Sequence, residues 1–190
     1  SNLASILTIG EQQASTLPIN YQIQMLAQLD TYTALIVAGM QGHNKSVTYN
    51  EVFKNDTVIL APIAEAECSS TVGVQLGTAM SIYAAGIGQG TLTGYGRLQS
   101  GFMSIPVIDT FLKKDSQPGL APLNKKVFIY QGEADTTVPK AATDLLIASM
   151  KANGTSASNI QYTTSAAWDH GTVYTQNYTS FVDNIDSLFQ

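Results

Sequence analysis

The composition of this 190-residue chain limits its class. Hydrophobic residues make up 44% of it and charged residues only 12%, with 9 Lys and Arg against 14 Asp and Glu for a net charge of -5. A chain of this length and apolar content can bury a core, so disorder is disfavoured. The acidic balance and the lack of a large Lys/Arg cluster disfavour nucleic-acid binding.

The cysteine and apolar patterns exclude further classes. The single cysteine, Cys68, cannot form an internal disulfide, and the sequence has no CxxC or Cys/His spacing typical of zinc. We therefore expect neither a metal site nor a cofactor. The longest weakly polar stretch, residues 72–88, contains Gln75 and Thr78 and is too polar for a membrane span.

The first residues and the glycosylation motifs bear on location. The chain starts without Met, a basic n-region or an apolar h-region, so we expect a processed or truncated start. Asn-x-Ser/Thr motifs give mild support for a secreted or extracytoplasmic protein, and they begin at Asn44, Asn55, Asn153 and Asn177.

The first part of the chain predicts mainly helices. Apolar stripes over residues 18–40 predict a helix buried over much of its circumference, which Gly39 and Gly42 are expected to end. A short apolar run predicts a possible strand near residues 57–63. A helix is expected behind it because apolar residues recur at helical spacing, at Val72, Leu76, Met80 and Tyr83.

The middle of the chain is rich in glycine. Residues 86–102 hold too many glycines for a packed element and predict a connector or a lid segment. We interpret residues 1–117 as a helical, cap-like region.

The last part alternates strand and helix. A continuous apolar run that ends in glycine, residues 127–132, is typical of a strand in a parallel sheet covered on both faces. Pro139 is placed to open a helix that an Asn-Gly pair ends. The pattern then predicts a second strand at 160–164 and an amphipathic helix at 178–189. Residues 118–190 are therefore predicted to form a β-α-β-α unit of an α/β fold.

Two polar loops follow the two predicted strands. Asp135 lies on the first loop and His170 on the second. The carboxyl ends of parallel strands meet at one edge of a sheet, and neighbouring strands lie only about 5 to 10 Å apart, so these side chains can meet. We expect His170 to act as a general base and Asp135 to orient its ring and stabilise the imidazolium.

The order of these elements resembles a known superfamily. A strand, the loop Gly-Glu-Ala-Asp-Thr-Thr-Val-Pro, a helix, a strand and then Asp-His-Gly resemble the C-terminal third of the α/β-hydrolases, the group of lipases, esterases and related serine peptidases. In that family the acid follows strand seven and the histidine follows strand eight. The resemblance covers about residues 120–190 and implies that Asp135 and His170 are two members of a catalytic triad.

The third triad member does not match the family pattern. The sequence has no Gly-x-Ser-x-Gly nucleophile elbow before the acid. Ser70 lacks flanking glycines, Ser100 and Ser104 fit less well, and Cys68, beside Glu67, is expected to be a small buried residue. We favour a nucleophile on missing upstream sequence over a catalytically inactive relative, with residues 1–117 as an inserted cap.

Other polar residues near the two loops have simpler interpretations. Asp169 is expected to shape its loop, because its side chain should diverge from the ring of the neighbouring histidine. Trp168 either lines the pocket mouth or packs within the loop. Glu133 is expected to face solvent, and His43 to sit in an exposed turn.

These observations predict a serine hydrolase acting on a carboxylic ester or lipid. The alternatives are an oligopeptidase-like serine peptidase and a non-catalytic binding protein with the same fold. The isolated chain is expected to be inactive. An unpaired sheet edge should be covered by the missing N-terminal half or by self-association.

Overall fold

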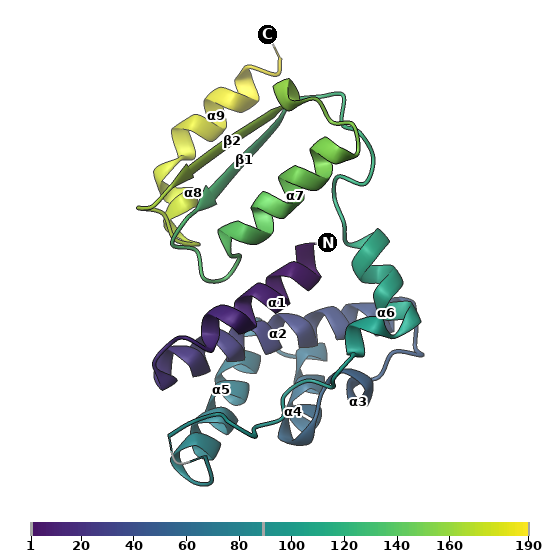
Figure 1. Cartoon of the computed structure of the whole chain (residues 1–190), viewed down its shortest axis with the longest axis vertical. Coiled ribbons are helices and arrows are strands. Elements are labelled where there is room, and N and C mark those ends of the chain that lie inside the picture. The colour runs from purple at the N-terminus through teal and green to yellow at the C-terminus, as the bar shows by residue number, and fades with distance from the viewer. Residues whose placement is uncertain (1, 89, 190) are drawn as a thin grey trace. The chain divides into compact units, whose positions relative to one another are not determined.

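The computed structural model describes residues 2–88 and 90–189, which form two compact units (Figure 1). We call residues 10–111 the helical unit, and residues 112–189 together with residues 2–9 the sheet unit. Most of the described chain is helical, with one small parallel sheet of two strands, so the content is mixed α/β. The first helix, α1 (Asn2–Ala14), contributes to both units.

The helical unit is built around the contact between α2 (Ile19–His43) and α5 (Ser69–Ala85). Small residues let the two helices approach closely: a Cβ added to Gly77 would lie 3.4 Å from Cβ of Ala27. Shorter helices complete the unit: α3 (Tyr49–Val52), α4 (Asn55–Leu60), the 3-10 helix η1 (Ala61–Glu65), η2 (Phe102–Ser104) and α6 (Pro106–Thr110). The largest fully buried side chains of this core include Phe53, Leu76, Met80, Val47, Val52 and Val72.

The first predicted helix is confirmed, but its predicted end is wrong. The helix continues through Gly39 and Gly42 to His43. A glycine inside a helix costs only about 1 kcal/mol relative to alanine. Burial of apolar side chains on the same helix outweighs that cost, including Met25, Leu26, Leu29, Val37 and Met40.

The prediction of a strand near residues 57–63 is also wrong, because this run is helical. It is covered by α4 and η1. Thr57 is fully buried, and its hydroxyl accepts a bond from the amide of Lys54 at 3.3 Å and donates to the carbonyl of the same residue. This local hydrogen bonding starts a helix. Periodicity alone does not separate a short apolar strand from a short buried helix.

The glycine-rich segment is a loop, as predicted, and an arginine fastens it to the helices. Arg97 places one guanidinium nitrogen 2.6 Å from Oδ1 of Asp30 on α2 and another 2.7 Å from Oε1 of Glu11 on α1. Its carbonyl accepts a hydrogen bond from the amide of Lys54 at 3.0 Å. Burial raises the pKa of Asp30 to about 6, although Arg97 acts to lower it.

The sheet unit confirms the predicted β-α-β-α order. Strands β1 (Val127–Gly132) and β2 (Ile160–Ser165) are parallel, with Val127 opposite Ile160 and Gly132 opposite Ser165. Figure 1 shows α7 (Lys140–Ala152) on one face of the sheet, and α8 (Thr172–Gln176) and α9 (Tyr178–Asp186) on the other. Helix α8 was not predicted. The 3-10 helix η4 (Ala157–Asn159) precedes β2, and the π-helix η3 (Phe111–Asp115) begins at the last residue of the helical unit.

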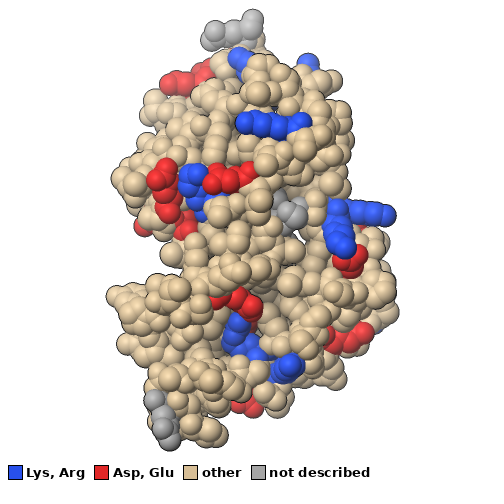
Figure 2. Space-filling view, in the orientation of Figure 1, with Lys and Arg blue, Asp and Glu red and all other residues tan. Residues whose placement is uncertain are grey.

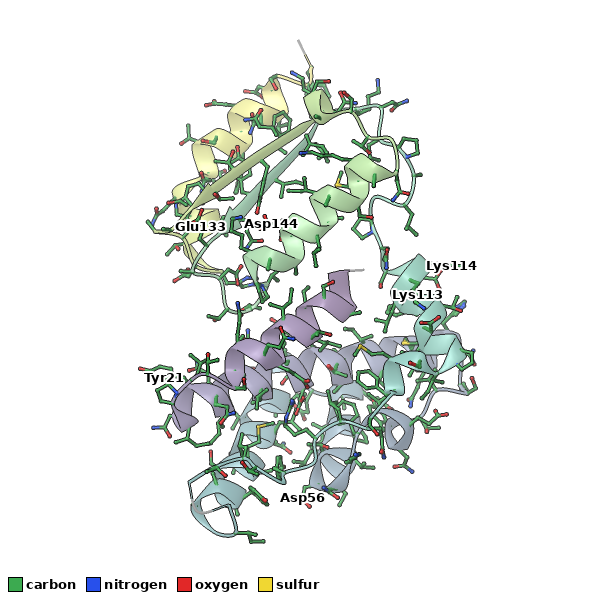
Figure 3. All side chains as sticks on the ribbon, in the orientation of Figure 1. Tyr21, Asp56, Lys113, Lys114, Glu133 and Asp144 are labelled. Carbon is green, nitrogen blue, oxygen red and sulfur yellow. The ribbon has the colours of Figure 1, made fainter. Side chains whose placement is uncertain are left out.

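Two sets of contacts hold these helices to the sheet. On the α9 face, the rings of Tyr130 and Phe181 meet edge to face with centroids 4.7 Å apart. On the α7 face, the Tyr162 hydroxyl donates to Asp144 at 2.9 Å, and Lys140 pairs with the same carboxylate at 2.9 Å. Figure 3 labels Asp144 on α7. Helices of the same unit therefore contact the sheet on both of its faces.

The surface carries few charges. Figure 2 shows the acidic and basic side chains as separate small groups on a face that is mostly uncharged. Within the described residues, every helix is too short or too polar to cross a lipid bilayer.

Candidate active site

The loop after β1 is bonded directly to the loop after β2. The amide of Glu133 donates to the carbonyl of Ser165 at 3.0 Å, and the amide of Ala134 donates to the carbonyl of Trp168 at 3.1 Å. The approach requires a glycine, because a Cβ at Gly132 would lie 2.3 Å from the Trp168 carbonyl oxygen. The two loops form one connected structure at the carboxyl edge of the sheet.

The side chain of a buried glutamine links the two ends of the first loop by hydrogen bonds. The Gln131 side-chain amide donates to the carbonyls of Gly132 at 2.8 Å and Val138 at 2.9 Å, while its oxygen accepts from the Thr143 hydroxyl at 2.6 Å. Sequence reasoning missed this residue. The signal was a polar residue near the end of an apolar strand, since a buried polar side chain needs hydrogen-bond partners.

Asp135 lies in the middle of this loop, and both oxygens of its carboxylate have hydrogen-bond partners. Its side chain is 5% exposed. Oδ1 accepts hydrogen bonds from the amides of Thr137 and Val138, both at 2.8 Å. Oδ2 lies 3.0 Å from Nδ1 of His170. The predicted contact between Asp135 and His170 is therefore confirmed, and bonds to an ionised carboxylate are among the stronger ones in proteins.

His170 presents its other ring nitrogen away from the carboxylate. Its side chain is 55% exposed. When Asp135 is ionised it can only accept from His170, so in the neutral ring Nδ1 carries the hydrogen and Nε2 has the free lone pair. Among the described residues, no hydrogen bond to Nε2 is present. The ring is thus fixed at one nitrogen and open at the other, as a general base requires.

Asp169 holds the shape of the histidine loop, as predicted. Its Oδ1 accepts from the amides of Gly171 at 3.0 Å and Thr172 at 2.7 Å, and the Thr172 hydroxyl accepts from the Asp169 amide at 2.8 Å. The bonds that the amide and the hydroxyl of Thr172 donate to this carboxylate lower the pKa of Asp169. The reciprocal pair resembles a capping box and directs the chain into α8.

The other two polar residues near the loops have structural contacts. The Trp168 indole donates to Oε1 of Gln176, the last residue of α8, at 3.0 Å. Glu133 is exposed, as predicted, and accepts a bond from the Thr164 hydroxyl at 2.7 Å. Figure 3 labels Glu133 just beyond β1.

The nucleophile candidates from the sequence lie in the helical unit. Cys68 precedes α5 and is exposed, so its predicted burial is wrong. Cys68 is the N-cap residue of α5, and at this position its side chain is exposed. Ser70 lines an open groove between α2 and α5 whose lining contains no histidine or carboxylate to activate a hydroxyl. His43 is exposed at the end of α2 rather than in a turn.

Comparisons with family models, curated proteins and solved structures give no match for this chain. Across residues 2–88 and 90–189, no group of three or more His, Cys, Asp or Glu side chains is arranged to hold a metal ion. The chemistry of the site therefore follows from its geometry. A buried carboxylate orients an exposed imidazole, an arrangement that can accept and return a proton.

Proposed function

We propose that this chain supplies the acid and the general base of a serine hydrolase that acts on carboxylic esters or lipids. In this proposal the sheet unit is the C-terminal part of an α/β-hydrolase sheet, and the helical unit is the cap-like region. The observation that carries it is the 3.0 Å contact between Asp135 Oδ2 and His170 Nδ1, formed by loops that follow two adjacent parallel strands.

The proposal gives each of the two residues a step. Nε2 of His170 takes the proton of an attacking serine hydroxyl, and the new bond joins the serine oxygen to the ester carbonyl carbon. The bond between this carbon and the alkoxide oxygen then breaks, and the imidazolium gives its proton to the leaving oxygen. In the second half of the reaction the same nitrogen takes a proton from water, whose oxygen bonds to the acyl carbon. The bond from that carbon to the serine oxygen breaks, and the ring returns the proton to the serine. Asp135 stays ionised throughout and stabilises the positive ring.

The burial of Asp135 suits this role. Its other oxygen is held by the amides of Thr137 and Val138, so the carboxylate keeps one orientation. A ring held in a single tautomer and orientation is ready to act without rearrangement. The proposal assigns the nucleophile and the oxyanion-hole donors to no residue of this chain.

The test uses the complete natural protein that contains this chain. A fluorophosphonate probe reports an activated serine, and a p-nitrophenyl ester reports turnover. His170→Ala should abolish labelling and lower kcat by about 10³-fold or more, because the base is lost. Asp169→Asn is the matched control, since it keeps an oxygen for the loop bonds, and its kcat should stay within about tenfold of the wild type.

Two results would contradict the proposal. Equal losses in the two variants would show that the acid has been misassigned. A protein that is never labelled and turns over no ester would favour the non-catalytic binding protein.

A further inference from the structure

The loop that holds the carboxylate of Asp135 is tied at both ends to one buried side chain. Gln131, on β1, is 5% exposed. Its side-chain nitrogen donates to the carbonyl of Gly132 at the start of the loop, at 2.8 Å, and to the carbonyl of Val138 at its end, at 2.9 Å. A primary amide has two hydrogens to donate, one for each of these carbonyls. The two ends of the loop are therefore fixed by the same group.

Only one orientation of this amide satisfies its three contacts. Backbone carbonyls can only accept, so the side-chain nitrogen of Gln131 must face the loop and its oxygen must face away. The oxygen lies 2.6 Å from the hydroxyl of Thr143 on α7, which can donate to it. A methyl group or an ionised carboxylate in place of the amide could not donate to the two carbonyls.

The groups that Gln131 holds are bonded in turn to Asp135. The carbonyl of Val138 accepts from Gln131, and the amide of the same valine donates to Oδ1 of Asp135 at 2.8 Å. At the start of the loop, the carbonyl of Gly132 accepts both from Gln131 and, at 3.4 Å, from the amide of Asp135. One residue at each end of the loop therefore connects the glutamine to the aspartate.

We propose that Gln131 is a positioning residue for the Asp135–His170 pair. Thr143 supports the amide orientation that this role requires. The second oxygen of the Asp135 carboxylate lies 3.0 Å from Nδ1 of His170, so its direction decides whether the ring keeps a hydrogen on that nitrogen. Without the Gln131 amide the end of the loop at Val138 is free to rotate, and the carboxylate loses its fixed direction.

The expected effect on turnover rests on the proposed function, whereas the expected effect on the ring does not. Gln131 is buried and acts through the loop, so its loss should lower kcat of the complete natural protein and leave KM nearly unchanged. A misplacement of about 1 Å can cost about 100-fold, and we expect kcat to fall by about 10- to 100-fold. The position of the ring hydrogen is measured on this chain without any substrate.

Nitrogen NMR of the purified chain with labelled histidine tests the proposal. The chain has two histidines, and the exposed His43 of the helical unit is the internal reference. At alkaline pH, where both rings are neutral, wild-type His170 should carry its hydrogen on Nδ1. Gln131→Met keeps the length of the side chain but cannot donate, so the ring nitrogens of His170 should shift towards those of His43. Gln161→Met, the same change on an exposed residue of β2, is the control and should shift neither ring.

Variants of Thr143 cover the case in which Gln131→Met folds poorly. Thr143→Val keeps the shape of the side chain and removes the hydroxyl, which leaves the oxygen of Gln131 without its donor. It should shift the ring nitrogens of His170 in the same direction. Thr143→Ser keeps the hydroxyl and should return them to the wild-type values.

The ring nitrogens separate positioning from a merely structural role. Urea melts followed by Trp168 fluorescence report the stability of each variant. A Gln131→Met chain that loses stability but keeps the wild-type ring nitrogens of His170 overturns the proposal, and so do unchanged ring nitrogens in Thr143→Val. Failure of the proposed function is a different result, because a complete protein that turns over no ester would still show the ring shift in these variants.

Discussion

Replacing Asp135 with alanine tests how far the carboxylate holds the candidate site together. The variant removes the acceptor for two backbone amides, those of Thr137 and Val138, and the bond to His170. A buried donor left without a partner costs about 1–3 kcal/mol. Val138 is only half-buried, so water can partly replace its bond. We expect the free energy of unfolding of the sheet unit to fall by about 2–4 kcal/mol.

The single tryptophan of the chain makes this measurable. Trp168 lies in the sheet unit, where its carbonyl accepts from Ala134 and its indole donates to Gln176. Its fluorescence therefore follows the unfolding of this unit in urea. With a denaturant slope of about 1–3 kcal/mol per M, the midpoint should fall by about 1 M or more.

The matched variant is Asp135→Asn. The asparagine oxygen can still accept from both amides, so its cost should be only about 1 kcal/mol. Its amide group would donate to Nδ1 of His170, which moves the ring hydrogen to Nε2 and removes the base. Nitrogen NMR of His170 reports this change of tautomer. Equal urea midpoints for the alanine and asparagine variants would refute the claim that the loop depends on this acceptor.

Three further predictions follow from other parts of the chain. Burial raises the pKa of Asp30 from 3.8 to about 6, so the folded helical unit binds this proton more tightly than the unfolded chain does. The free energy of unfolding should therefore rise by up to about 3 kcal/mol as the pH falls from 7 to 4, and Asp30→Asn should remove that rise in urea melts followed by circular dichroism. Gly132→Ala should push the strand away from the Trp168 carbonyl, lowering the urea midpoint of the sheet unit by about 1 M or more and shifting the Trp168 emission. The purified chain alone should not turn over p-nitrophenyl esters, and turnover lost in His170→Ala would instead reveal a nucleophile within it, with Ser70 the first residue to replace.

Local patterns were enough to predict the two strands of the sheet unit and its helices α7 and α9. The apolar run at residues 127–132 and the amphipathic spacing of the helices depend on near neighbours in sequence, which are also neighbours in space. The contact between Asp135 and His170 was predictable for a related reason. Loops after adjacent parallel strands open at one edge, so the order of the elements brings the two residues together.

Tertiary contacts decided what the local patterns left open. The run at residues 57–63 is helical, and α2 continues past Gly39, because packing outweighs weak local preferences. The pairing of Arg97 with Asp30 joins residues 67 positions apart, and no sequence spacing indicates it. The use of Gln131 to close the acid loop is likewise set by groups from other elements.

By itself, then, the sequence determined the order of β1, α7, β2 and α9 in the sheet unit and the identity of the two residues that meet at its edge. The tertiary structure alone decided how the carboxylate of Asp135 is held and which polar side chains are buried. The physical reason is the separation along the chain over which each effect acts. Periodicity and turn chemistry act over a few residues, whereas burial and hydrogen bonding of a polar group depend on whatever the fold brings beside it.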